Sequence, residues 1–146
     1  MRYLWAVLVL LASAAGAAEV GPCNDLDRIS SLVGQTRSFS QEKIKIAHVD
    51  TDGEPVCCSS HLLVFIPSPE IGSQCFAVSQ QAAKADGSAR GFSNVEFSRI
   101  KAAYDPKRGL LLTVPYTLYN DGKPGKPGTV NVRVNLTGNG SVRIEP

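Results

Sequence analysis

Two adjacent cysteines, Cys57 and Cys58, are the residues of this chain whose type and spacing most readily support chemistry. His61 follows three residues later, and Cys75 lies further along the chain. Such side chains can ligate zinc or copper, and a cysteine beside a histidine base can act as a nucleophile. The paired C-x-x-C spacing that makes zinc sites recognisable is missing. A nucleophile would need a free thiol close in space to His61 or His48. Structural disulfides are therefore the favoured interpretation.

The N-terminus indicates the redox environment that these thiols meet. Residues 1–17 have the three parts of a secretory signal peptide, which are Arg2, an apolar run and the small residues of a cleavage site. The apolar run is shorter than the roughly 20 residues that a transmembrane helix needs. We therefore predict that residues 1–17 are removed. Residues 18–146 are then a single exported globular domain, periplasmic or secreted, without a membrane anchor.

In an exported chain the four cysteines are expected to form disulfide bonds. A bond between Cys57 and Cys58 is disfavoured, because its ring is very small and bonded cysteines usually have Cα atoms about 5.5 Å apart. Two pairings remain open: Cys23–Cys57 with Cys58–Cys75, or Cys23–Cys58 with Cys57–Cys75. In the loop-entropy model each bond would stabilise the fold by about 3 to 4 kcal/mol.

The elements that must position these residues are predicted to be one helix followed by strands. Asn24 or Asp25 can cap a short helix that ends at Gly34. The expected fold class is α+β, with this N-terminal helix packed on a single antiparallel sheet of about six or seven strands, stapled by disulfides. A small β-sandwich or partial barrel is the alternative.

The strands are predicted from apolar periodicity. Strands are expected from Lys43, His61 and Cys75, and the continuous apolar run from His61 indicates a central strand buried on both faces. Residues 94–119 and 130–144 are each expected to form a hairpin. The apolar phase of the first hairpin slips near Ser98–Arg99, which indicates a bulge, and Pro115 indicates an edge position or irregularity. One face of its second strand is expected to hold Leu110, Leu112, Val114, Tyr116 and Leu118.

The loop of residues 120–129 is the candidate binding surface. A hairpin needs only about two to five loop residues, and this loop has about ten, repeating Gly-Lys-Pro. Its prolines stiffen it, and loops on rigid sheets often carry binding residues. The predicted contact residues are Tyr116, Tyr119, Lys123 and Lys126. The alternative is a connecting loop without function.

Charge and motifs exclude several classes of function. Removing Arg2 from the 15 basic residues leaves 14 against 13 acidic ones, so the mature net charge is about +1. This balance offers no electrostatic basis for binding nucleic acid or an anionic membrane. No nucleophile elbow, phosphate loop or H-E-x-x-H motif occurs in the sequence. We predict no catalytic residue, metal ligand or cofactor.

These observations favour an exported, non-enzymatic binding module. An inhibitor or immunity-type protein that acts on another exported protein is one example. The alternatives are an enzyme that depends on cysteine or histidine, and an assembly subunit that pairs through a sheet edge. A free thiol would favour the enzyme, and concentration-dependent light scattering would favour the assembly subunit.

Overall fold

The computed structural model describes residues 18–24, 33–51, 57–86 and 88–146. The first half of the described chain forms β1 (Glu19–Pro22), β2 (Val33–Phe39), β3 (Ile44–Asp50), β4 (Ser60–Ser68) and β5 (Gly72–Ser79). The second half forms β6 (Asn94–Val95), the 3-10 helix η3 (Phe97–Arg99), β7 (Lys101–Asp105), β8 (Gly109–Leu118), β9 (Lys126–Asn135) and β10 (Ser141–Glu145). No helix in these ranges is long and apolar enough to cross a membrane. The predicted signal peptide lies outside the described residues.

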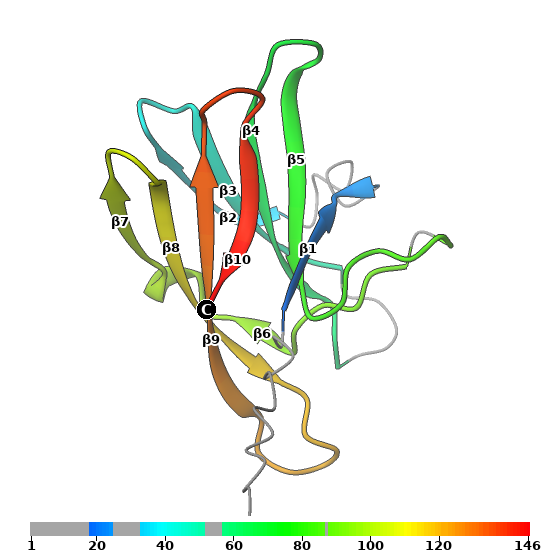
Figure 1. Cartoon of the computed structure of the whole chain (residues 1–146). Coiled ribbons are helices and arrows are strands. Elements are labelled where there is room, and N and C mark those ends of the chain that lie inside the picture. Colours follow the sequence, from blue (N-terminus) through cyan, green and yellow to red (C-terminus); the bar gives the residue numbers. More distant parts are fainter. Residues whose placement is uncertain (1–17, 25–32, 52–56, 87) are drawn as a thin grey trace, which may run out of the picture.

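The strands make two antiparallel sheets, and each sheet comes from one half of the chain (Figure 1). The N-terminal sheet has the order β1-β5-β4-β3-β2. The C-terminal sheet has the order β10-β9-β8-β6, and β7 also pairs with β8. Most neighbouring strands are consecutive in the chain, which short turns between antiparallel strands allow. The exceptions are β1, which lies beside β5 at the edge opposite β2, and β6, which pairs with β8.

The predicted single sheet with a packed N-terminal helix is wrong. Val33 and Gly34, where the helix was expected to end, belong to β2. The register of β2 against β3 shifts between Val33 and Gln35, so Gly34 lies at a bulge and does not cap a helix. The rest of the expected helix, residues 25–32, lies outside the described residues. Both halves of the chain supply an apolar sheet face, and two such faces can bury each other. The alternative of a β-sandwich is the closer description.

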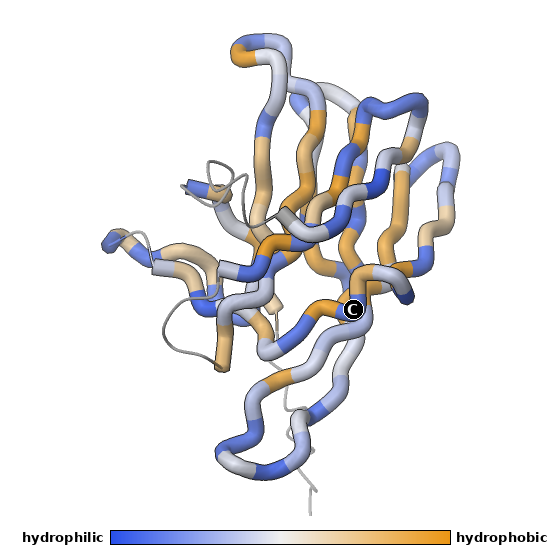
Figure 2. The backbone as a smooth tube through the Cα atoms, turned by 180° about the vertical axis from the view of Figure 1, so that it is seen from behind, coloured by the Kyte–Doolittle hydropathy of each residue, from blue (hydrophilic) through white to orange (hydrophobic). Residues whose placement is uncertain are grey.

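One apolar core joins the two sheets. The N-terminal sheet contributes six residues that are at most 1% exposed, and the C-terminal sheet contributes alternate residues of β8, β9 and β10. The core residues of these strands are Ile44, Ile46, Leu62, Val64, Ile66 and Val78 with Leu110, Leu112, Val114, Tyr116, Val130, Val132, Val134 and Val142. Figure 2 shows hydrophobic stretches along the strands and a mainly hydrophilic loop at the bottom of the molecule. The predicted apolar face of β8 is confirmed: Leu110, Leu112, Val114 and Tyr116 are buried, and Leu118 packs against the core.

The N-terminal sheet is also buried on its other face. A second apolar cluster there contains Cys23, Ala47, Val49, Leu63 and Ala77. Leu62 and Leu63 are neighbours on β4 and belong to the two different clusters, both with no exposed surface. Because successive side chains of a strand point to opposite faces, β4 is buried on both sides. This confirms the prediction of a central strand.

The edge of the C-terminal sheet contains the predicted irregularity. β6 and β7 pair with different parts of β8, and η3 separates them at the expected position. The Pro115 carbonyl accepts the Glu96 backbone N–H at 3.0 Å, so the backbone of Pro115 faces this interruption. Proline has no N–H to offer the ladder. The break between β6 and β7 therefore lies where β8 has no donor.

Candidate functional site

The first disulfide bond joins Cys23 to Cys75, with Cα atoms 5.6 Å apart. β1 pairs with β5 so that Pro22 lies opposite Phe76, and the residues that follow and precede this pair are the two cysteines. The bond is therefore a tie between neighbouring strands. Both pairings predicted from the sequence are wrong on this point, because they did not include β1. Once β1 lies beside β5, Cys75 is the nearest partner for Cys23.

The second disulfide bond joins the adjacent residues Cys57 and Cys58, and all cysteines of the described chain are therefore bonded. Sequence reasoning rejected this pairing because its ring is small. With Cys23 and Cys75 already joined, however, the adjacent thiols have only each other. The pair lies in a turn just before β4, where Cys58 is buried and Cys57 is half-buried. A cysteine nucleophile would first require reduction of one of these bonds.

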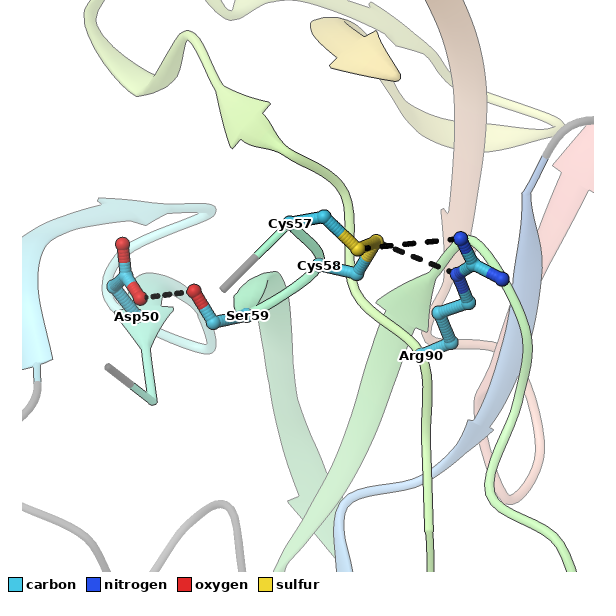
Figure 3. Close-up of a disulfide and its surroundings, with 5 residues drawn as sticks. All are labelled: Asp50, Cys57, Cys58, Ser59 and Arg90. Atoms are coloured by element: carbon cyan, nitrogen blue, oxygen red, sulfur yellow. Dashed lines mark hydrogen bonds between the residues drawn. A yellow bond between two sulfur atoms is a disulfide. The ribbon is translucent and has the colours of Figure 1, made fainter. Parts of the chain in front are cut away.

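Arg90 lies over the Cys57–Cys58 disulfide (Figure 3). Its Nε donates to the sulfur of Cys58 at 3.4 Å, and its Nη2 lies 4.0 Å from the sulfur of Cys57. On the other side of the turn, the Ser59 hydroxyl donates to the Asp50 carboxylate at 2.5 Å. Sequence reasoning missed Arg90 because it is 32 residues from Cys58. Neither the residue types nor the spacing along the chain indicated a contact between Arg90 and the two cysteines.

Both histidines pair with serine hydroxyls inside the N-terminal sheet. His61 Nδ1 lies 2.8 Å from Ser79 Oγ, and His48 Nε2 lies 2.8 Å from Ser60 Oγ. Burial lowers the pKa of His61 to about 4, although the Asp50 carboxylate opposes this shift. Burial lowers the pKa of His48 as well, again against the effect of Asp50. The interior therefore favours the neutral imidazole of each histidine.

These serine–histidine pairs join elements of the fold. A serine beside a histidine is also the pairing used in nucleophilic catalysis. Here Ser60 is 1% exposed and Ser79 is 0% exposed, so a substrate has no access to either hydroxyl. Ser60 Oγ also accepts the backbone N–H of Val95 at 3.0 Å. Because Ser60 belongs to β4 and Val95 to β6, this hydrogen bond ties one sheet to the other.

The structure separates the four predicted contact residues into two groups. Tyr116 is 6% exposed and stacks on Phe92, with ring centroids 4.6 Å apart. It also lies opposite Gly128, where a larger side chain would collide with its ring. Burial raises the pKa of the Tyr116 hydroxyl. Tyr116 is therefore a core residue and does not share the surface of the loop. The alternation of β8, which predicted its apolar face, already carried this signal.

The other three residues lie at the protruding end of the β8–β9 hairpin. Tyr119 is 51% exposed, and Lys123 and Lys126 are exposed as well. Figure 1 shows this hairpin extending below both sheets, away from the loops at the opposite end. We call residues 119–126 the hairpin tip. The hairpin tip brings one aromatic side chain and two lysines to the same end of the molecule.

A groove at the opposite end of the molecule was not predicted. It has a volume of about 770 Å³ and lies between the β2–β3, β7–β8 and β9–β10 turns. Phe39, Tyr104 and Leu136 contribute to its walls, and Lys43 and Lys107 also line it. The groove draws on both sheets. No single segment of the sequence could therefore reveal it.

Candidate metal ligands do not gather in the described parts of the chain, where no group of three or more His, Cys, Asp or Glu side chains could hold an ion. No protein-family model, curated protein or solved structure matches this chain. The disulfide bonds indicate an oxidising environment.

Proposed function

We propose that this protein is an exported binding module that contacts another exported protein through the hairpin tip, in the manner of an inhibitor or immunity-type protein. The observation that carries the proposal is an ordered, exposed tip that the core does not need. Export is inferred from the signal-peptide pattern of residues 1–17, and the disulfide bonds agree with it.

The conformation of the hairpin tip supports this proposal. The strand pairing continues to Leu118 and Lys126, so β8 and β9 carry the tip on a continuous ladder. Asp121 and Gly122 have φ angles of 35° and 72°, and the Lys123 N–H donates to the Asn120 carbonyl at 2.8 Å. Two positive φ angles inside such a bond are typical of a type I′ turn. The Asn120 side chain also donates to the Pro124 carbonyl at 3.0 Å. An ordered tip loses little conformational entropy on binding.

The chemistry of the hairpin tip favours a protein partner with an acidic surface. Tyrosine is enriched among the residues that dominate binding energy at interfaces, and Tyr119 is the exposed aromatic of the tip. Lys123 and Lys126 would lie at the rim, where charges act mainly on the association rate. Tyr116 is excluded from this surface by its burial.

The experiment compares the hairpin tip with the opposite end of the molecule. Wild-type protein is used to capture proteins from extracts of the exported compartment, and binding of the captured protein is then measured directly. Replacing residues 119–125 by Asn-Gly joins the paired residues Leu118 and Lys126 through a two-residue turn. This variant should lose binding. The matched control is Tyr104→Ser, because Tyr104 is 69% exposed at the other end.

Point substitutions separate effects on binding affinity from effects on the association rate. Tyr119→Ser should weaken binding by about tenfold or more, as expected for a central aromatic contact. Lys123→Glu with Lys126→Glu should mainly slow association. Unchanged affinity in the shortened variant would reject the hairpin tip as the contact surface. Loss of binding in Tyr104→Ser would then place the contact at the opposite end of the molecule.

A second candidate function is binding of a small amphipathic anion in the end groove. Its support is the combination of apolar walls with Lys43 and Lys107 in a groove of about 770 Å³, within the range of ligand sites. An anilinonaphthalene sulfonate probe combines an aromatic body with an anionic group. Its fluorescence should rise with the native protein and fall with Lys43→Glu and Lys107→Glu. Equal fluorescence for the wild type and this double variant would reject the second candidate.

A further inference from the structure

We propose that the Cys57–Cys58 disulfide is a reducible site that exchanges with a dithiol, while Cys23–Cys75 stays closed. The two bonds differ in the parts of the structure that they connect. Cys23–Cys75 spans 52 residues and ties β1 to β5, and Cys23 is 3% exposed. Cys57–Cys58 spans one residue and joins no separate elements. Opening it therefore frees no long loop, whereas opening Cys23–Cys75 does.

The two sulfurs of the adjacent pair differ in access. Cys57 is half-buried and can be approached from solvent, whereas Cys58 is 3% exposed. Thiol–disulfide exchange depends on which sulfur an incoming thiolate can reach. The difference therefore favours attack on Cys57, which makes Cys58 the leaving sulfur.

Arg90 lies where negative charge would develop on that leaving sulfur. Its Nε is 3.4 Å from the sulfur of Cys58 (Figure 3). The backbone holds Arg90 in place, since its N–H and carbonyl both pair with Gln81, at 3.1 and 3.0 Å. The next residue, Gly91, donates its N–H to the Cys58 carbonyl at 2.7 Å. A Cβ at Gly91 would lie within 2.8 Å of the backbone of Cys58 and Ser60, so this close docking requires glycine. A cation held beside a sulfur stabilises its thiolate.

The exchange consists of two balanced steps. A thiolate of the dithiol attacks the sulfur of Cys57, which breaks the bond to Cys58 and forms a mixed disulfide with Cys57. Cys58 leaves as a thiolate beside Arg90 and takes up a proton. The second thiol of the reagent then attacks its own sulfur in the mixed disulfide and releases Cys57. The dithiol is oxidised to a cyclic disulfide. Its two electrons and two protons are transferred to Cys57 and Cys58, which become thiols.

The test uses graded dithiothreitol on the folded exported protein, followed by alkylation. Cleavage after Glu42 and Glu70 releases residues 43–70, in which Cys57 and Cys58 are the only cysteines. Alkylation of this peptide and of Cys75 can then be measured separately by mass spectrometry. Half-reduction of Cys57–Cys58 is expected at a dithiothreitol concentration about tenfold or more below that for Cys23–Cys75. Equal concentrations, or a non-reduced map that links peptide 43–70 to another peptide, would overturn the proposal.

The role of Arg90 is tested by Arg90→Gln. Its initial rate of Cys57–Cys58 reduction should fall about three- to tenfold, because the leaving thiolate loses its cation. Arg143→Gln is the matched control, since Arg143 is an exposed arginine on β10, and its rate should not change. Arg90→Lys keeps the positive charge and should recover part of the rate. Circular dichroism checks that each variant is folded. An unchanged reduction rate in folded Arg90→Gln would overturn the role assigned to Arg90. The difference between the two disulfide bonds is tested separately, because it is measured in the wild-type protein.

Discussion

The N-terminal half of the molecule carries all four cysteines and both histidines, whereas the C-terminal sheet carries none of these residues. In the N-terminal sheet, Cys23–Cys75 and the pairing of His61 with Ser79 connect neighbouring strands. In the C-terminal sheet, β8 alternates between core and outer face along its length. Its main polar tie is on the outer face, where Arg133 donates to Glu145 at 3.1 and 3.0 Å.

This difference follows from how many faces each sheet buries. The N-terminal sheet is covered on both faces, so a polar side chain within it needs an internal partner. The apolar core uses one face of the C-terminal sheet, so the other can carry polar and charged residues along the same strands, such as Arg133, which is 4% exposed and paired with Glu145. Along β8 of this sheet, buried core positions alternate with half-buried outer positions. A sheet with two buried faces needs specific contacts that join distant segments.

The largest expected effect tests the buried face of the C-terminal sheet. Leu112→Asp would place a carboxylate at a position with no exposed surface and should destabilise the protein by about 4 kcal/mol or more. Thr113→Asp is the matched control on the outer face, where Thr113 is half-buried, and should cost about 1 kcal/mol or less. Chemical denaturation measures both. Similar losses for the two variants would show that alternation does not organise this sheet.

The next effect compares the two disulfide bonds of the N-terminal half. Cys23→Ala with Cys75→Ala should lower the free energy of unfolding by about 4 kcal/mol, as loop entropy predicts for a separation of 52 residues. Cys57→Ser with Cys58→Ser should cost about 1 kcal/mol or less, because the loop between adjacent residues is minimal. Denaturant midpoints of the two double variants give the comparison. A larger loss of unfolding free energy on removing Cys57–Cys58 would show that this bond, and not Cys23–Cys75, stabilises the fold more.

A somewhat smaller effect is expected from pH. The pKa of His61 is about 4 in the folded protein, against 6.5 for an unperturbed histidine. Between these values the unfolded state binds more protons, so the free energy of unfolding should fall as pH falls from 6.5 to 4 and then level off. The loss is about 3 kcal/mol, and the lowered pKa of His48 acts in the same direction. His61→Gln should remove most of this slope in denaturation curves measured across the range. A slope that persists unchanged would contradict the assignment.

The smallest effect is expected at the hairpin tip. Replacing residues 119–125 by Asn-Gly should change the free energy of unfolding by less than about 0.5 kcal/mol, because loop-closure cost varies slowly with length and the residues of the tip are exposed and outside the apolar core. Thermal unfolding measures this change, independently of any partner. A marked drop in the thermal midpoint would mean that the tip supports the C-terminal sheet and does not serve binding alone.

Much of the C-terminal half was predictable from local patterns. The apolar face of β8, the interruption at η3 and the turn between β9 and β10 lie where the sequence indicated them. The two-sided burial of β4 was predictable from its continuous apolar run. The candidate site was less so: Tyr119, Lys123 and Lys126 are exposed as expected, but Tyr116 is buried. Alternation along β8 places Tyr116 on the core side, and this outweighs its nearness to the loop.

The sequence by itself determined the strands from β3 onward and the C-terminal hairpins, because side-chain alternation and turn residues act over a few neighbouring positions. It did not indicate β1 or β2. Only the tertiary structure decided that there are two sheets, that β1 lies beside β5, and therefore that Cys23 bonds to Cys75. It also brought Arg90 to the adjacent disulfide. These contacts join residues that are distant along the chain. Their free energy comes from burying whole sheet faces against each other, which no local pattern specifies.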